Sequence, residues 1–295
     1  MVLLVLVLAA LTPIYGHKLK DQKHINSIEY SFISPRVDLE LETNNSDQLL
    51  RYSPDVATSS NIGLNFKSFG ISASFKNPNE SDNEQSEYND YTIRSPIANG
   101  IFEVTYSRFK GFKVNGQSSK DLLPITSESY GVSYTFFINK NVEILQNLGH
   151  FVKDKANDYG AFASIGFTKN MLNSRDTLVS STTQSFKDFS GLRSFEQDSI
   201  YATYGIAGSA TFKNIYFQGA IGLGMNLSQI QYEGSNLKNS TKTGPTGKSQ
   251  FNLGYQFNNS ILGIEANLTR ISDLQSNSEL SISKTDVHIY YHYFF

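Results

Sequence analysis

Apolar residues recur at every second position through most of the chain, which is the period of a β-strand and not of a helix. Around residue 225, for example, Leu223, Met225 and Leu227 alternate with the polar residues Asn226 and Ser228. Successive side chains of a strand point to opposite faces of a sheet, so each such segment has one apolar face and one polar face. The pattern predicts an all-β protein.

About twelve such segments follow one another between residue 33 and the C-terminus. Short turns, such as Lys213-Asn214 and Asn258-Asn259, alternate with long polar connections. An even number of strands with alternating short and long connections is typical of bacterial single-chain barrels, whose short turns face the periplasm. The stretch 139–157 is the exception, and we interpret it as extended strand ends or a small periplasmic excursion. The expected long connections are 43–58, 77–88, 111–127, 170–198 and 233–246.

The last segment ends on an aromatic ring, and its two faces differ sharply. One face holds Val287, Ile289, Tyr291, Tyr293 and Phe295, and the other includes His288 and His292. This strand resembles the closing strand of bacterial outer-membrane barrels, in which alternating apolar residues that end on Phe are read by the insertion machinery. An ordinary edge strand of a soluble sheet is the alternative.

The apolar faces are expected to point outward into lipid, Val37, Leu39 and Leu41 among them. Twelve strands enclose more volume than their side chains readily fill, and small residues such as Gly222 and Gly224 would fill it poorly. The polar faces would then line the lumen. The candidate lining residues are Arg36, Asp38, Glu40, Arg94, Glu103, Glu265, His288 and His292.

The N-terminus predicts export from the cytoplasm. Residues 1–11 are almost wholly apolar, a length that is typical of a secretory signal and too short to span a membrane. No later run of 18 apolar residues would form a transmembrane helix. We therefore expect a cleaved signal peptide over 1–16, a periplasmic N-terminal segment over 17–32 and the barrel over 33–295.

Composition excludes several classes of chemistry. The chain has no cysteine, which removes disulfides and thiolate sites, and its net charge of −2 does not suggest nucleic-acid binding. No hydrolase, zinc-protease or phosphate-loop motif occurs. His288 and His292 share a face but lie roughly 13 Å apart, too far for one metal ion. We predict no catalytic residue, no metal site and no cofactor.

A family resemblance supports the location. The hairpin at 61–76, Tyr52-Ser53-Pro54, the Phe109-Lys110-Gly111-Phe112 piece and the strand from Gly131 to Asn139 resemble recurring pieces of a family of bacterial envelope proteins. That family is known only as a domain of unknown function, number 4421. The resemblance covers about residues 50–230 and implies a location and an architecture, but no activity.

The sequence therefore predicts a transmembrane, antiparallel, up-and-down β-barrel in the bacterial outer membrane. Its expected contacts are outer-membrane lipid and the barrel-insertion machinery. Two classes of function stay open: a non-enzymatic barrel, either a narrow pore or a structural or surface-exposed envelope protein, and an outer-membrane lipid hydrolase. The hydrolase would need a Ser and a His within hydrogen-bond reach at the barrel wall. Charged lumen residues would line a selective channel or pair with one another and block it.

Overall fold

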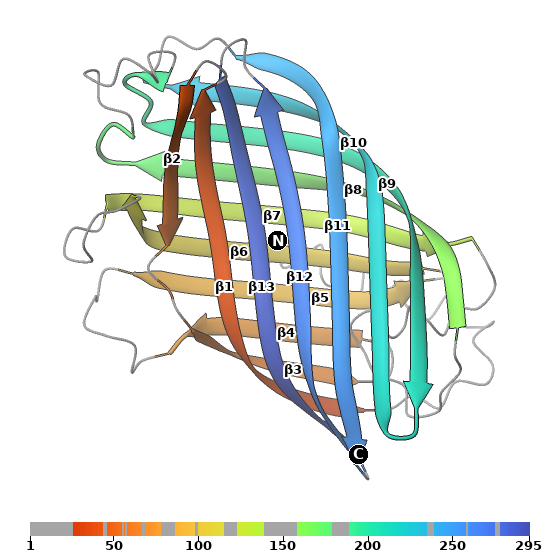
Figure 1. Ribbon diagram of the computed structural model, residues 1–295. Coiled ribbons are helices and arrows are strands. Elements are labelled where there is room, and N and C mark those ends of the chain that lie inside the picture. The colour runs from red at the N-terminus through yellow and green to blue at the C-terminus, as the bar shows by residue number, and fades with distance from the viewer. Residues whose placement is uncertain are drawn as a thin grey trace.

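The structure, a computed structural model, describes residues 26–43, 46–54, 56, 58–66, 69–77, 86–97, 100–114, 123–138, 158–178, 189–234, 239–257, 259–274 and 278–295. The expected signal peptide, most of the segment 17–32 and the stretch 139–157 lie outside these residues. The described strands form one antiparallel sheet that closes on itself (Figure 1). They are β1 (Ser27–Thr43), β2 (Ser46–Pro54), β3 (Ser59–Phe66), β4 (Phe69–Lys76), β5 (Glu87–Ile97), β6 (Gly100–Val114), β7 (Leu123–Phe137), β8 (Asp158–Ser174), β9 (Ser194–Phe212), β10 (Ile215–Glu233), β11 (Ser240–Phe257), β12 (Ser260–Leu274) and β13 (Ser278–Phe294).

The terminal strand closes the barrel by pairing with the first one. β13 and β1 pair from Ser27 opposite Phe294 to Thr43 opposite Ser278. A fully closed sheet has no exposed edge, so its backbone hydrogen-bonding groups are satisfied within a membrane. The two-residue connections from β3 to β4, β5 to β6, β9 to β10 and β11 to β12 lie at the end where β1 starts and β13 finishes. By the rule for bacterial barrels this end faces the periplasm.

The barrel has more strands at its periplasmic end than at its opposite end. Near the periplasm β1 pairs with β3, which leads through β4 and β5 to β6. Farther out β1 pairs with β2 instead, and β2 pairs directly with β6 through residues 52–54 and 112–114. Counting the described strands around the wall gives twelve at the periplasmic end, where β2 is absent. The other end has ten, because the short strands β3, β4 and β5 do not reach it.

Two expected boundaries differ from the structure. The stretch 43–58, expected to be a loop, contains β2, and β1 begins at Ser27 and not near residue 33. Several other strands also extend into segments that were expected to be loops. β8 continues to Ser174, β9 begins at Ser194 and β11 begins at Ser240. The sequence does not indicate these strand ends, because they are polar and the apolar alternation stops where the strands leave the membrane.

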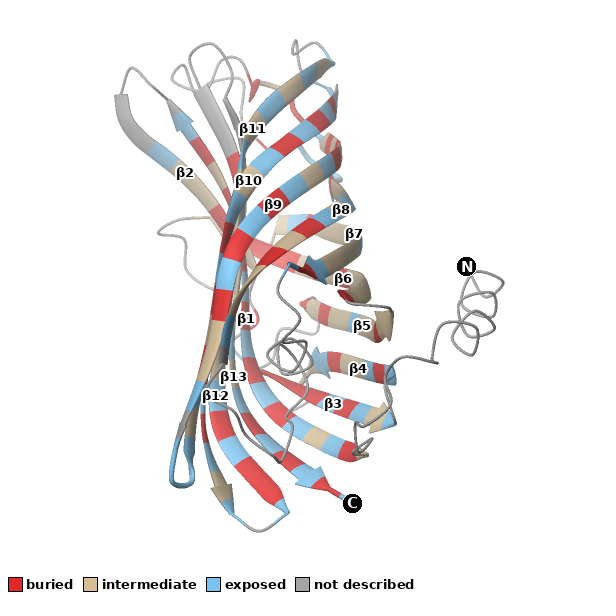
Figure 2. Cartoon of the chain, turned by 90° about the vertical axis from the view of Figure 1, so that its right-hand side faces the viewer, coloured by how far each residue is buried: buried red, intermediate tan, exposed pale blue. Residues whose placement is uncertain are grey.

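The periplasmic part of the wall carries an apolar belt on its outer surface. Large apolar side chains are exposed on β1, on β3 to β5 and on β7 to β13, and buried and exposed residues alternate along β9 and β10 (Figure 2). Leu223, at the middle of this belt, is 72% exposed. A closed barrel with such a belt is an integral outer-membrane protein. We call this region the transmembrane part.

No helix in the described part of the chain is long and apolar enough to cross a membrane.

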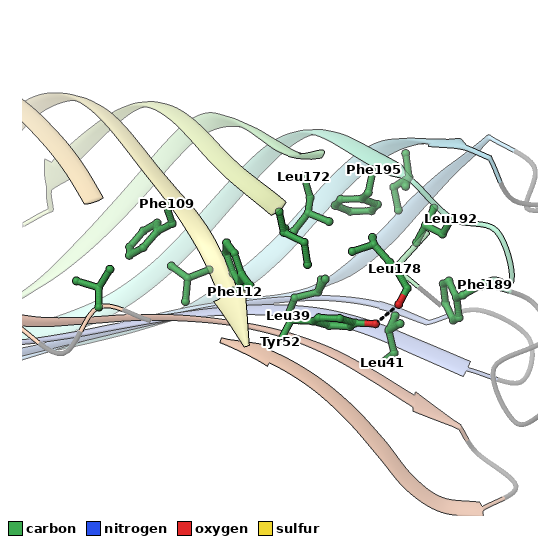
Figure 3. Close-up of a cluster of buried hydrophobic side chains, with 14 of the residues drawn as sticks. Leu39, Leu41, Tyr52, Phe109, Phe112, Leu172, Leu178, Phe189, Leu192 and Phe195 are labelled. Carbon is green, nitrogen blue, oxygen red and sulfur yellow. Dashed lines mark hydrogen bonds between the residues drawn. The ribbon is translucent and has the colours of Figure 1, made fainter. Parts of the chain in front are cut away.

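Beyond the belt the two faces of the wall exchange their character. On β1, Ile28 and Phe32 point outward in the transmembrane part, but farther along it is Leu39 and Leu41 that point inward and are buried. We call this outer region, from residue 34 of β1 onward and the matching ends of its neighbours, the extracellular extension. Its interior holds a cluster of buried apolar residues from β1, β2 and β5 to β10, and from residues 178, 189 and 192 between β8 and β9 (Figure 3).

The predicted orientation of β1 was therefore wrong beyond residue 33. Arg36, Asp38 and Glu40 share the face of Phe32 and point outward, whereas Val37, Leu39 and Leu41 fill the interior. Their charges are met on the outer surface, where Arg36 Nε lies 2.7 Å from Asp38 Oδ2 and Arg51 pairs with Glu40. The reason is the change of solvent: outside the membrane water surrounds the wall, so the apolar face turns inward as in a soluble protein.

Candidate functional site in the barrel lumen

The lumen of the transmembrane part holds a polar cavity. Its volume is about 350 Å³, and side chains from nearly every strand of the wall line it. Of the predicted lumen residues, Arg94, Glu103, Glu265 and His288 line this cavity. His292 also points inward and is buried, 1% exposed, toward the periplasmic end. These five residues therefore lie on the inner face of the barrel.

Two ion pairs join strands that are not neighbours in the barrel. Lys284 of β13 places its Nζ 2.8 Å from Asp90 Oδ2 of β5, and Lys248 Nζ of β11 lies 4.0 Å from Glu103 Oε1 of β6. Glu103 also pairs with Arg94 on the adjacent strand β5. These contacts run through the interior from one wall to another.

A second polar group lies at the periplasmic side of the cavity, around Glu29 of β1. Its Oε2 is 2.6 Å from His292 Nε2, and its Oε1 accepts hydrogen bonds from Ser31 Oγ and Asn61 Nδ2, each at 3.3 Å. β1 and β13 are paired here, with Glu29 directly opposite His292. The group therefore links the first, third and last strands at the seam where the barrel closes.

Glu265 of β12 has surroundings of a different kind, because neutral amides hold it. Gln250 Nε2 and Asn267 Nδ2 donate to Oε1 at 3.1 and 2.8 Å, and Asn252 Nδ2 donates to Oε2 at 3.4 Å. Asn252 is itself oriented, because Tyr216 and Tyr290 donate their hydroxyl protons to its Oδ1 at 2.8 and 2.6 Å. The carboxylate is therefore fixed in place by amides, with no ion pair within 4 Å among the described residues.

The predicted lumen set missed several charged residues. Glu29, Asp90, Lys248, Lys284 and Asp286 all line the cavity. Lys284 and Asp286 have the same parity as His288 on the terminal strand, so alternation counted farther back would have found them. Glu29 was missed because β1 was expected to begin after it. The lining then holds five carboxylates against three basic groups, a net negative lumen as predicted but with different members.

The predicted insertion signal lies on the lipid side of the terminal strand. Val287, Ile289, Tyr291, Tyr293 and Phe295 are all 40–65% exposed on the outer surface. Tyr290, His292 and Phe294 alternate with them and are buried inside. The alternation of the last strand is therefore confirmed.

The outer end of the lumen is filled by side chains. Tyr52, Phe112, Leu172 and Ile230 are each at most 2% exposed, and Figure 3 shows residues of this cluster pointing toward one another across the extension. Leu178 joins them, since the Tyr52 hydroxyl donates a hydrogen bond to its carbonyl oxygen. The cavity therefore ends, on the extracellular side, against a packed apolar core.

Comparisons with known proteins place the chain in a family without an assigned activity. A family described as a domain of unknown function, DUF4421, matches residues 19–295. No curated protein matches. The outer membrane protease OmpT from Escherichia coli is similar at 8% identity and a TM-score of 0.42, over 95% of this chain and 100% of that chain. The COG4313 outer membrane channel from Pseudomonas putida F1 is similar at 11% identity and a TM-score of 0.38, over 94% of this chain and 98% of that chain. The P. putida toluene transporter TodX is similar at 8% identity and a TM-score of 0.31, over 93% of this chain and 91% of that chain.

Proposed function

This chain belongs to the DUF4421 family, and because the description of that family names no activity, we propose a function from the geometry of the barrel itself. We propose that the protein is a non-enzymatic, surface-exposed outer-membrane barrel whose lumen is sealed at its extracellular end. The observation that carries this proposal is the buried apolar cluster in the extracellular extension. A permanently open pore would need a continuous polar path at this level.

The ion pairs inside the transmembrane part support the same function. Lys284–Asp90 and Lys248–Glu103 connect separate strands through the lumen, which reduces the free cross-section below the apolar cluster. The lipid-hydrolase alternative has no support from the described histidines, because His288 and His292 both lie on the inner face of β13. A Ser–His site at the lipid boundary would need the outer face.

Conductance across a planar lipid bilayer tests the sealed state. The refolded protein should give no sustained current steps. Replacing Phe112 and Leu192 together by Gly removes two fully buried side chains from the seal and should produce steps. Steady conductance of the unmodified protein would overturn the proposal. Such a pore should then prefer cations, since five carboxylates face three basic groups in the cavity, and the reversal potential in a salt gradient would report this preference.

The proposed contact with the insertion machinery rests on the lipid-facing residues of β13. Deleting Phe295, which is 65% exposed next to the last pair of the β1–β13 ladder, should leave a secreted chain that inserts poorly. Heat-modifiable migration on a gel measures the folded fraction in membranes. Phe295→Tyr, which keeps an aromatic ring at the end of the chain, is the matched control and should insert like the unmodified protein. Equal folded fractions for the chain with and without Phe295 would contradict this role.

A further inference from the structure

The cavity of the transmembrane part carries more negative than positive charge, and the excess is concentrated at one wall. Asp90, Glu103 and Glu29 each face a basic or histidine side chain at hydrogen-bond distance. Glu265 accepts hydrogen bonds from three amides and makes no ion pair within 4 Å among the described residues, although the Arg94 guanidinium acts on it at longer range. A carboxylate without a direct ion pair inside a membrane-spanning barrel can still attract a cation that enters the cavity.

Asp286 of β13 lies beside Glu265 and has an oxygen without a partner. In the register of β12 and β13, Glu265 is opposite His288 and Asn267 is opposite Asp286, so the two carboxylates are diagonal neighbours on one face. Asp286 Oδ2 is 3.8 Å from Lys284, but its Oδ1 is buried and makes no hydrogen bond with any described group. This orphan acceptor is independent evidence for a hydrogen-bond donor that the chain does not supply.

The site is held rigid before any ligand arrives. Tyr216 and Tyr290 hold the amide oxygen of Asn252, which turns its Nδ2 toward Glu265. The long 3.4 Å contact at Oε2 leaves that oxygen able to accept a shorter bond from the lumen. A pre-ordered acceptor loses little conformational entropy on binding, which favours affinity.

We propose that Glu265 and Asp286 bind the primary ammonium group of a small amine inside the cavity. An ammonium carries one positive charge and three N–H donors, which matches two carboxylates that offer one weakly bonded and one unbonded oxygen. A directly ligated metal ion fits less well, since no group of three Asp, Glu or His side chains within the described residues is arranged to hold one. A volume of about 350 Å³ lies at the lower end of the range for small-molecule pockets.

We expect the ligand to enter from the periplasmic side, because the apolar cluster closes the extracellular side. The cavity lining extends down to Asn65 and Gly70, which flank the turn between β3 and β4 at the periplasmic end. On the other side the lining ends at Tyr88 and Ile282, which border the apolar cluster of the extension. The inference goes beyond the sealed barrel proposed above and does not need the seal, because binding at this wall is independent of conductance.

Isothermal titration of the refolded barrel with 1,4-diaminobutane at low salt tests the site. We expect saturable binding with one ligand per barrel. Glu265→Gln should weaken it about 10-fold or more, because it removes a charge-assisted hydrogen bond. Asp286→Asn should weaken it by a smaller factor, about 3-fold. Glu128→Gln, which removes one carboxylate from the outer surface next to Arg108, is the control and should bind like the unmodified protein.

Three outcomes would overturn the proposal: no saturable binding by the unmodified barrel, equal affinity of Glu265→Gln, or displacement of the diamine by Mg²⁺ at equal concentration. The last outcome would identify a general cation site. Tetramethylammonium, which has charge but no N–H donor, should not compete. Heat-modifiable migration checks that each variant is folded. If Glu265→Gln does not fold, the affinity of Asp286→Asn alone tests the site. Conductance recorded on the same samples separates this result from that of the sealed barrel.

Discussion

The first strand passes through two environments, and its two halves obey opposite rules. Between Ser27 and Phe32, β1 points apolar residues outward and Glu29 and Ser31 inward. Between Ser34 and Glu42 it points Leu39 and Leu41 inward and Arg36, Asp38 and Glu40 outward. The backbone pairing with β13 continues without a break through both halves. The face that a strand buries is therefore set by the surrounding solvent and not by the fold.

The difference between the two regions is sharpest for aromatic residues. Phe112 is completely buried inside the extracellular extension, whereas Phe251 is 42% exposed on the lipid side of the transmembrane part. Phe112→Ala should lower the free energy of unfolding by about 3–5 kcal/mol, because it leaves a cavity in a packed core. Phe251→Ala should cost less than half as much, since lipid chains move into the space. Denaturant titration in lipid vesicles measures both, and similar losses would remove the distinction between the regions.

Charge on the outer surface should be tolerated in one region and not in the other. Leu223→Arg places a cation at the middle of the belt and should cost about 2–4 kcal/mol of folding stability. Gln229→Arg, three alternations farther along the same face of β10, lies in the extension and should change stability by less than about 0.5 kcal/mol. The same vesicle titration compares them. Equal costs would place both residues in the same environment.

Breaking an ion pair should cost more stability in the transmembrane part than on the extension, because the pairs of the transmembrane part lie inside the barrel. Lys284→Met leaves Asp90 and Asp286 in the lumen without their shared cation and should cost about 1–3 kcal/mol. Lys284 is one-third exposed, which keeps the cost below that of a fully buried pair. Methionine keeps the length of the side chain, so the change reports mainly the charge. A smaller loss of stability than for Arg51→Ala, on the outer surface, would indicate that water in the cavity already screens Lys284.

The smallest effect is expected for the pairs on the outer surface of the extension. Arg51→Ala breaks the contact with Glu40 and should change stability by about 0–1 kcal/mol, since exposed ion pairs contribute little. High salt should reduce this effect further. A loss of several kcal/mol would show that Arg51 supports the β1–β2 pairing in a way that its charge alone does not explain.

Much of the transmembrane part was predictable from the sequence. The alternation along β10 and β11 placed Leu223 and Leu253 on the lipid side and Asn226 and Asn252 inside, and the structure agrees. The turn at 213–214 connects β9 to β10 as expected. These segments were predictable because lipid outside and polar groups inside give a strict period of two.

The extracellular extension was not predictable with the same rule. Phe32 is the last apolar residue of β1 that points outward, and Ile33 is the first that points inward. Two neighbouring apolar residues therefore mark the exchange of faces, and the apolar alternation shifts by one residue there. β2 was missed because it has few apolar residues, and two of these, Leu50 and Tyr52, pack inside the extension while Leu49 is exposed. A rule that assumes one solvent along the whole strand assigns both segments wrongly.

The candidate site was predictable only in part, because its contacts join distant segments. Glu103, Glu265 and His288 were placed in the lumen by parity alone. No local pattern indicates that Lys284 meets Asp90, 194 residues away in the chain. Likewise, the amides around Glu265 come from β11 and β12, and their tyrosine supports come from β10 and β13. Such contacts depend on the number of strands between two residues around the barrel, which the sequence defines only after closure.

The charged outer surface of the extension has a consequence for assembly. A chain that enters the bilayer from the periplasmic side has to carry this whole surface through the hydrocarbon layer before the extension reaches water. Pairing Arg36 with Asp38, Arg51 with Glu40 and Lys169 with Glu196 offsets part of the charge that this surface carries. These pairs then lower the barrier to crossing more than they stabilise the finished barrel. Their loss should appear as slow insertion of a protein that, once inserted, is as stable as before.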